Sequence, residues 1–312
     1  MSTPSGFRYK RIDSQIRGVV VDLEGIFFDH GLHTMQEAMK QAFQAKGIEI
    51  DAETMRTTTP DTHPKDATLK VGLLRALAEK FNEKAARTSG SAQANGSTKT
   101  TTAANGERSP GAPSKQAHLS TAWLIPQLVQ EFDAAYLKEG KSCKPIQRAV
   151  DTLKHLTESG VKLGMIADCT SEMMELYSVR AKYYGFLPDV FVSTSTCAPK
   201  APQPWAIFAC LKEMGVFPPS SVVRVTTTVE GVEEGLNAGC IVVGVARTGL
   251  YVSESSSVDL DAPIAKDVEN RSREAAEQLW RAGAHHVIEG IWELPAALTE
   301  LGTLKRLSHL QI

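Results

Sequence analysis

The length, composition and charge of this chain exclude several classes of protein. A chain of 312 residues with 42% hydrophobic side chains can bury a large core, so we expect either one large domain with an insertion or two domains. The net charge of −2 argues against a nucleic-acid partner, and no apolar run has the length that a membrane span needs. The five cysteines lack C-x-x-C spacing, which is typical of a reduced compartment without disulfides or a zinc site.

The N-terminal segment leaves two localisations open. Arg8, Lys10 and Arg11 are mixed with serine and threonine and no acid, as in a short mitochondrial presequence. A frayed basic terminus is the simpler explanation of the same residues. We therefore expect a cytoplasmic protein, with a mitochondrial location as the alternative.

The first predicted element is a buried strand that ends in an acid. Residues Gly18–Val21 are apolar and mostly β-branched, and the run is too short for a helix, so it predicts a strand of a parallel sheet. Asp22 ends this strand, at the edge where open α/β sheets bind ligands, and Gly25 lets the chain turn away. Asp22 is therefore a candidate nucleophile, although an aspartate here can also simply cap a turn. The pattern D-x-x-G resembles the opening motif of the haloacid dehalogenase superfamily.

Residues 31–140 predict a small helical cap. Apolar residues at helical spacing indicate helices over 34–46, over 67 to about 86, and from about Trp123 to Gly140. The Thr- and Pro-rich stretch 55–66 predicts a loop. Residues 87–116 are rich in Ser, Thr, Gly, Ala, Asn and Lys, with almost no large apolar side chain, and predict a disordered insertion.

From Pro145 onward, predicted helices and strands alternate. Strands are expected over 161–167, 189–194, 222–226, 241–246 and, as an edge strand, 284–288. Helices are expected over 146–159, 171–184, 204–214, 229–238 and 273–282, with a loop over 253–269. This alternation predicts a doubly wound, mostly parallel sheet. The fold class is therefore α/β, with a Rossmann-like core formed by residues 12–30 and 141–312.

Several phrases resemble one family of that superfamily, the phosphonoacetaldehyde hydrolases, or phosphonatases. They include GVVVDLEGIFFDHG, VKLGMIADCTSEMM, PKAPQPW, EGVEEGLNAG and RAGAHHVIE. The resemblance implies a Rossmann-like core of the haloacid dehalogenase type with an inserted helical cap. It also implies cleavage of the carbon-phosphorus bond by an aspartate nucleophile, a cap lysine that forms an imine with the aldehyde, and a magnesium ion held by carboxylates.

The first motif matches the family in part. Asp22 occupies the nucleophile position. Glu24 stands where the family carries a small alanine and where other superfamily members carry an acid-base aspartate. The small hydroxyl pair that follows the glycine in the family is replaced by Ile26 and Phe27, which cannot hydrogen-bond a phosphate.

The phosphate-binding positions implied by the resemblance are substituted. The threonine of the second motif falls on Ala167, and Asp168 places a negative charge next to it. The arginine of the third motif falls on Ala201. Lys200, one position earlier, is a candidate replacement, although it offers a point charge instead of a fork.

The positions of the magnesium ligands and of the imine-forming lysine differ most from the family pattern. The family pattern G-D-T-x-x-D reads here as TTTVEG, so the two acids fall on Thr227 and Gly231. Glu230 is one position away and would point about 100° off on a helix. The cap lysine falls on His63 in an ungapped match, and a two-residue shift brings Lys65 to that position.

These substitutions favour a catalytically inactive family member, a pseudoenzyme that keeps the fold to bind a protein partner, an assembly or a small anionic metabolite. Such a protein needs no cofactor. The alternative is an active hydrolase that uses Asp22, Lys65 and Lys200 with a rearranged magnesium site. Phosphonatase relatives form dimers through their caps, so the resemblance also implies a homodimer.

Overall fold

The computed structural model describes residues 16–29, 32–57, 69–93, 121–249, 252 and 263–308. Contacts between Cα atoms divide the chain into two compact units. An α/β unit combines the chain up to Met35 with Tyr136–Ile312, and a helical unit comprises Gln36–Ala135. Within the described ranges, no helix is both long and apolar enough to cross a membrane.

The α/β unit is built on a six-stranded parallel sheet of order β3-β2-β1-β4-β5-β6. The strands are β1 (Gly18–Asp22), β2 (Lys162–Ala167), β3 (Val190–Ser193), β4 (Val222–Thr226), β5 (Ile241–Val245) and β6 (His286–Ile288). All five strands predicted after Pro145 are present, and β6 lies at the edge as expected. The order reverses between β1 and β4, so Asp22 ends its strand at the topological switch point where such sheets bind ligands.

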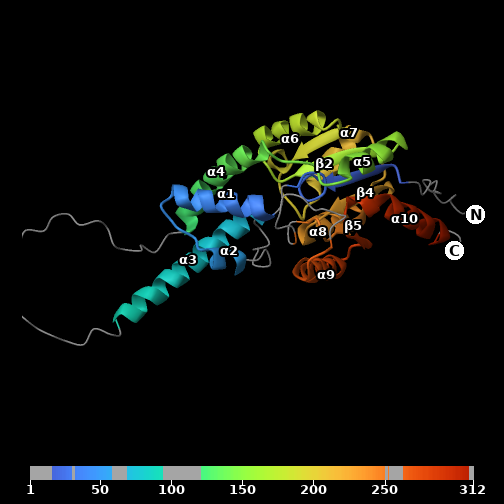
Figure 1. Ribbon diagram of the computed structural model, residues 1–312. Coiled ribbons are helices and arrows are strands. Elements are labelled where there is room, and N and C mark those ends of the chain that lie inside the picture. Colours follow the sequence, from blue (N-terminus) through green and yellow to red (C-terminus); the bar gives the residue numbers. More distant parts are fainter. Residues whose placement is uncertain are drawn as a thin grey trace, which may run out of the picture. The chain divides into compact units, whose positions relative to one another are not determined.

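Helices flank both sides of this sheet (Figure 1). They are α5 (Ala149–Glu158), α6 (Ser171–Tyr183), α7 (Trp205–Met214), α8 (Val229–Ala238), α9 (Lys266–Arg281) and α10 (Leu294–Ser308). A buried cluster joins Val20, Ile166 and Val192 of three neighbouring strands to Ile207 and Cys210 of α7. The strands are β-branched and buried on both faces, which is the pattern of a parallel sheet.

The helical unit contains most of α1 (Leu32–Ala45) and α4 (Thr121–Gly140), together with α2 (Ala52–Thr57) and α3 (Leu69–Gln93). Each long helix buries one apolar side, as Phe43, Leu74 and Leu128 show with no exposed side-chain surface. Two ion pairs link the helices or their ends. Lys70 Nζ lies 2.7 Å from Asp133 Oδ1, and Lys46 Nζ lies 2.8 Å from Glu131 Oε1.

Two expectations about this unit were wrong in part. The predicted loop over 55–66 begins inside α2, because Asp51 caps that helix and accepts hydrogen bonds from the backbone N–H and the hydroxyl of Thr54. The predicted insertion over 87–116 begins inside α3, which continues to Gln93 through residues that include good helix formers such as Ala86 and Arg87. Residues 58–66 and 94–116 lie outside the described residues.

The C-terminal part also differs from expectation. The predicted loop over 253–269 is wrong at its end, since α9 begins at Lys266. Acids in the first turn and the ion pairs of Asp267 with Arg271 and of Glu269 with Arg273 favour this longer helix. Residues 253–262 lie outside the described residues. Helix α10 was not predicted, although Pro295 stands in its first turn, a position that proline favours.

The close approach of α8 to the sheet yields a test of the core. A Cβ atom at Gly235 would lie 2.6 Å from Val242 Cγ2 and 2.9 Å from Arg224 Cγ. We expect Gly235→Ala to lower the free energy of unfolding by about 1–2 kcal/mol, because overpacking outweighs the better helix propensity of alanine. Gly302→Ala in α10, where no atom lies within 4 Å of the added Cβ, is the matched control. It should be neutral or stabilising by up to about 1 kcal/mol in urea denaturation, and equal stabilities of both variants would contradict the packing described.

Candidate active site

Asp22 is held by three donors at the switch point of the sheet. Its Oδ1 is bound by Arg224 Nη2 of β4. Its Oδ2 accepts from Thr226 Oγ1 at 2.7 Å and from the backbone N–H of Thr227 at 3.1 Å. A carboxylate has about four acceptor positions, so three of them are already occupied by the protein itself.

Arg224 is a buried cation between two carboxylates. Its side chain is 3% exposed, and its Nη2 also lies 3.3 Å from Glu234 Oε2, whose side chain is 4% exposed. Burial works against the charge of the guanidinium, but the negative charges of Asp22 and Glu234 outweigh it and raise the pKa of Arg224. Burial raises the pKa of Glu234, and Arg224 opposes that shift. The Arg224 charge is therefore committed to these two acids.

Thr226 and Gly231 fit each other, which explains two substitutions at once. A Cβ atom at Gly231 would lie 1.9 Å from Thr226 Oγ1 and 2.8 Å from Thr226 Cβ. The threonine side chain thus fills the space that any side chain at position 231 would need. In the family pattern the first position is glycine and the last is the acid. In this chain the larger side chain is at the first position, Thr226, and the last position is glycine. The Thr226 hydroxyl donates a hydrogen bond to Asp22.

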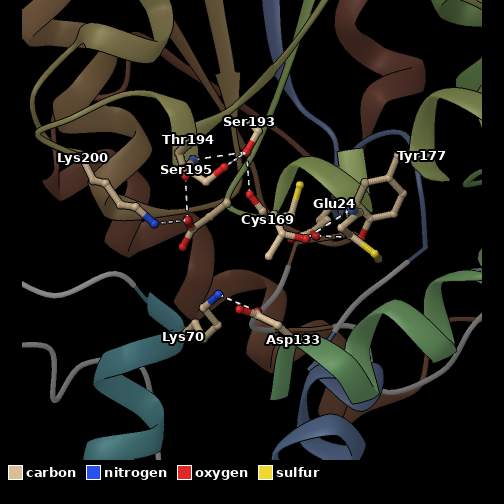
Figure 2. Close-up of polar contacts among 12 residues, drawn as sticks. Glu24, Lys70, Asp133, Cys169, Tyr177, Ser193, Thr194, Ser195 and Lys200 are labelled. Carbon is tan, nitrogen blue, oxygen red and sulfur yellow. Dashed lines mark hydrogen bonds and ion pairs between the residues drawn. The ribbon is translucent and has the colours of Figure 1, made fainter. Parts of the chain in front are cut away.

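Glu24 lies in a separate polar cluster. Its Oε1 accepts from Tyr177 Oη at 2.7 Å, an interaction drawn in Figure 2. Burial raises the pKa of Glu24 from 4.5 to about 7, the Tyr177 hydrogen bond opposes the shift, and repulsion from Asp168 adds to it. The carboxyl group therefore titrates near neutral pH, but the described hydrogen bond holds it on the tyrosine of α6.

Lys200 is paired with Asp168. Its Nζ lies 2.7 Å from Asp168 Oδ1, and Thr194 Oγ1 donates to the same oxygen at 2.6 Å (Figure 2). The two residues that sequence analysis placed beside the phosphate position thus neutralise each other. Ala167 is buried at the end of β2, and Ala201 is exposed in the turn after Lys200. Neither of these two side chains can donate a hydrogen bond.

The apolar residues of the first motif belong to the core. Ile26 and Phe27 have no exposed side-chain surface, and the Phe27 ring lies 4.7 Å from the ring of Phe28. Gly25 adopts a φ of 75°, and a Cβ there would lie 3.1 Å from the carbonyl oxygen of Thr248. The turn after β1 therefore packs inward, with its side chains committed to apolar contacts.

Two predicted site residues lie outside the described residues, His63 and Lys65. In the helical unit, the lysine that the structure does describe near that part of the chain is Lys70. It is paired with Asp133 (Figure 2), and its Nζ lies 5.7 Å from the centre of the Phe132 ring.

Sequence reasoning missed Arg224, the residue that determines the electrostatics of the site. A signal was present, since Arg224 interrupts the apolar strand VVRVT, and a charged residue inside a buried strand needs a partner. Its partners stand 202 positions earlier and 10 positions later in the chain, so their identity could not be read from spacing alone.

The residues around Asp22 do not fit a magnesium ion. Magnesium prefers several oxygen ligands that include carboxylates, whereas Asp22 faces a guanidinium, a hydroxyl and an N–H group. Thr227 directs its backbone N–H at Asp22, and Gly231 offers no side chain. Among the described residues, no three His, Cys, Asp or Glu side chains gather as ligands. Glu230 is the acid next to Gly231 in the sequence. One of its carboxylate oxygens is buried without a hydrogen-bond partner in the described part of the chain.

Comparisons with known proteins agree with the fold and the motifs. The sequence model of the family described as haloacid dehalogenase-like hydrolase matches residues 69–245. The chain is 27% identical to a phosphonoacetaldehyde hydrolase of Bacillus cytotoxicus over 91% of this chain and 96% of that protein. It is 28% identical to a phosphonoacetaldehyde hydrolase of Bacillus cereus, over 90% of this chain and 94% of that protein.

A solved structure shares the fold over nearly the whole chain. It is a phosphonoacetaldehyde hydrolase-like protein from Oleispira antarctica, with a TM-score of 0.70 and 21% sequence identity. The alignment covers 93% of this chain and 94% of that one. At this identity the likeness shows the fold alone.

Removal of the buried cation should destabilise the α/β unit in a pH-dependent way. Arg224→Met leaves Asp22 and Glu234 without their counter-charge, so we expect a loss of about 3–5 kcal/mol of unfolding free energy near neutral pH. The loss should shrink as pH falls, because protonation removes the uncompensated negative charges of these two carboxyl groups. Arg281→Met, which removes an exposed arginine paired with Glu277, should change stability by less than about 0.5 kcal/mol. A stable Arg224→Met variant at neutral pH would contradict the proposed role of the ion pair.

Glu24 should give the protein a second pH dependence. Its folded pKa of about 7 lies above its ordinary value, so its contribution to stability is complete below about pH 4.5 and is lost as pH rises through 7. Glu24→Gln stays neutral and should therefore become more favourable relative to the natural protein as pH rises. The stability difference between the two proteins should change by about 2–3 kcal/mol between about pH 5 and pH 9 in urea denaturation. A difference that is constant with pH would show that Glu24 is not shifted.

Proposed function

The chain belongs to the haloacid dehalogenase-like hydrolase family, and from this premise we propose that it is a catalytically inactive member related to the phosphonoacetaldehyde hydrolases. In this proposal Arg224 supplies the positive charge that a magnesium ion supplies in a working site. The protein keeps the fold for binding, and Asp22 serves as a structural anion. The observation that carries the proposal is the buried ion pair of Asp22 with Arg224.

The ion pair accounts for the loss of nucleophilic attack. A carboxylate attacks phosphorus through a free lone pair, and the attack brings two anions together. Two like charges about 4 Å apart repel by about 4 kcal/mol at the effective dielectric constant of a partly buried site. A metal ion would bind both anions and lower this barrier. Arg224 is already shared between Asp22 and Glu234, so it has little charge left for a substrate phosphoryl group.

The phosphate subsite supports the same proposal. Lys200 is the cation closest to the third motif, and it is bound to Asp168 at 2.7 Å. A phosphoryl group entering there would have to displace an ion pair and would meet the carboxylate of Asp168. The hydroxyl of Thr194 also donates to that carboxylate. The local charge is therefore balanced without any ligand, which is the arrangement expected when a phosphate-binding function has been lost.

In this proposal, the surfaces that the substitutions leave intact determine which partners and ligands the protein can bind. A disabled family member retains a folded sheet edge and a helical unit that can contact a protein partner, an assembly or a second copy of the chain. A small anionic metabolite remains the other class of ligand, in keeping with the substrates of the relatives. Both are parts of the proposal.

One observation favours a second candidate, a working hydrolase with a rearranged metal site. Glu230 stands in the first turn of α8, and its Oε2 is buried with no hydrogen-bond partner in the described part of the chain. A cation could satisfy that oxygen. If it did, Glu230 and Asp22 would be the metal ligands.

Metal binding and turnover separate the two candidates. We expect calorimetric titration with magnesium and with manganese to show no binding at millimolar metal concentrations. We also expect no hydrolysis of phosphonoacetaldehyde or p-nitrophenyl phosphate above the level of the Asp22→Asn variant. Turnover that depends on both Asp22 and Glu230, tested with Glu230→Gln, would contradict the inactive assignment and establish the second candidate.

A restored variant provides the positive control. Thr226→Gly, Thr227→Asp and Gly231→Asp together remove the threonine that fills the position-231 space and return both acids of the family pattern. Added to Arg224→Met, they should create a manganese site that the natural protein lacks, since ligand charge sets the affinity of hard cations. Gly231→Asp alone should disrupt folding, because its Cβ would lie 1.9 Å from Thr226 Oγ1. Tight metal binding by the natural protein, equal to that of the restored variant, would contradict the account.

A further inference from the structure

Helix α6 exposes an apolar stripe on the surface of the α/β unit. Val179 and Tyr183, one helical turn apart, are 60% and 75% exposed, and Leu187, shortly after the end of the helix, is 51% exposed. The buried residues of α6 lie on the other side of the helix and are Met173, Met174, Tyr177 and Ala181. Large apolar side chains that gather on one surface mark a site of association.

Charged side chains divide this exposed face into an acidic half and a basic half. Glu172 and Glu175 stand in the N-terminal half of α6, Lys182 stands in its last turn, and all three are exposed. Neither Glu175 nor Lys182 has an ion-pair partner in the described part of the chain. Residues pair along a helix when they are three or four positions apart, so Glu175 and Lys182 are not neighbours within one molecule.

The exposed ring of Tyr183 is held in place by its surroundings. The guanidinium carbon of Arg180 lies 5.3 Å from the centre of the Tyr183 ring and 5.1 Å from the centre of the Tyr184 ring. Arg180 is itself fixed, because its Nη2 donates to the carbonyl of Cys143 at 2.8 Å and to the hydroxyl of Tyr184 at 2.9 Å. A side chain that is already ordered loses less entropy when a partner covers it.

The arrangement of side chains around α6 is complementary to itself. With Val179 as the centre and about 100° per residue, Glu175 and Lys182 lie to one side of it, and Leu176 and Tyr183 lie to the other. A two-fold axis between antiparallel helices keeps these sides together and exchanges the two halves of the helix. It therefore places Glu175 opposite Lys182 of a second copy and Leu176 opposite the Tyr183 of that copy. The two Val179 side chains meet on the axis.

We propose that the exposed face of α6 pairs with the same face of a second copy of this chain, with the two helices antiparallel around Val179. A parallel pairing would bring like charges to the same level of the two helices, which is unfavourable. The charge pattern of the helix therefore selects the antiparallel arrangement. The face belongs to the α/β unit, so this interface differs from the cap contacts that the family resemblance implies.

Sedimentation velocity at low ionic strength tests this proposal, because exposed charges are then least screened. A single pair of helices makes a small interface, so we expect the natural protein to self-associate with a dissociation constant of roughly 10–200 μM. Val179→Glu places two carboxylates at the axis and should weaken the association at least about tenfold.

Charge reversal tests the antiparallel register. Glu175→Lys alone and Lys182→Glu alone each create like-charge pairs across the axis, and each should weaken the association about fivefold or more. The double variant Glu175→Lys/Lys182→Glu restores opposite charges across the axis and should recover most of the lost affinity. A merely local effect of either substitution on α6 would not be reversed in this way.

Two controls keep the test specific. Phe217→Ser changes an exposed aromatic residue between α7 and β4 and should leave the association unchanged. Asp22→Asn should also leave it unchanged, so that failure of this proposal is distinct from failure of the proposed function. The proposal is overturned if the natural protein stays monomeric up to about 500 μM, if folded Val179→Glu associates as tightly, or if the double charge reversal does not restore affinity.

Discussion

The buried contact between Asp22 and Arg224 is the constraint on which the rest of the site depends. Asp22 ends the first strand at the switch point of the sheet, and a bare carboxylate there would need a counter-charge. The protein provides one from the neighbouring strand and balances it with Glu234 on α8. Because all three side chains belong to rigid elements of the core, the charge is fixed in place. The negative charge of Asp22 is thereby neutralised by the protein itself.

The substitutions around this contact form a consistent set. The resemblance implies three carboxylates around a doubly positive ion, with a total charge of −1, and two carboxylates around one guanidinium have the same total. Thr226 fills the space that a side chain at Gly231 would need and also donates to Asp22. Lys200 neutralises Asp168 at the second motif. Each change removes a demand that another change would otherwise have left unmet, which is consistent with the proposal of an inactive family member.

Much of the fold could be predicted from the sequence, because the buried strands and amphipathic helices of the α/β unit have strong periodic patterns. The exceptions are segments whose composition predicts a loop but in which capping or charged side chains stabilise a helix. Asp51 starts a helix inside a Thr-rich stretch, and the acids at the start of α9 extend it to Lys266. At the site, sequence motifs identified Asp22 and the substituted positions Thr227 and Gly231. They could not show the pairing of Asp22 with Arg224, the commitment of Lys200 to Asp168, or the contact of Glu24 with Tyr177, because these contacts join residues far apart in the chain.

A crystal structure of the protein grown with excess manganese tests the central claim most directly, since anomalous scattering locates that ion without assumptions about its ligands. The account predicts no anomalous peak beside Asp22 and an intact ion pair with Arg224. A manganese ion bound to Asp22, with the guanidinium of Arg224 displaced from the carboxylate, would contradict it.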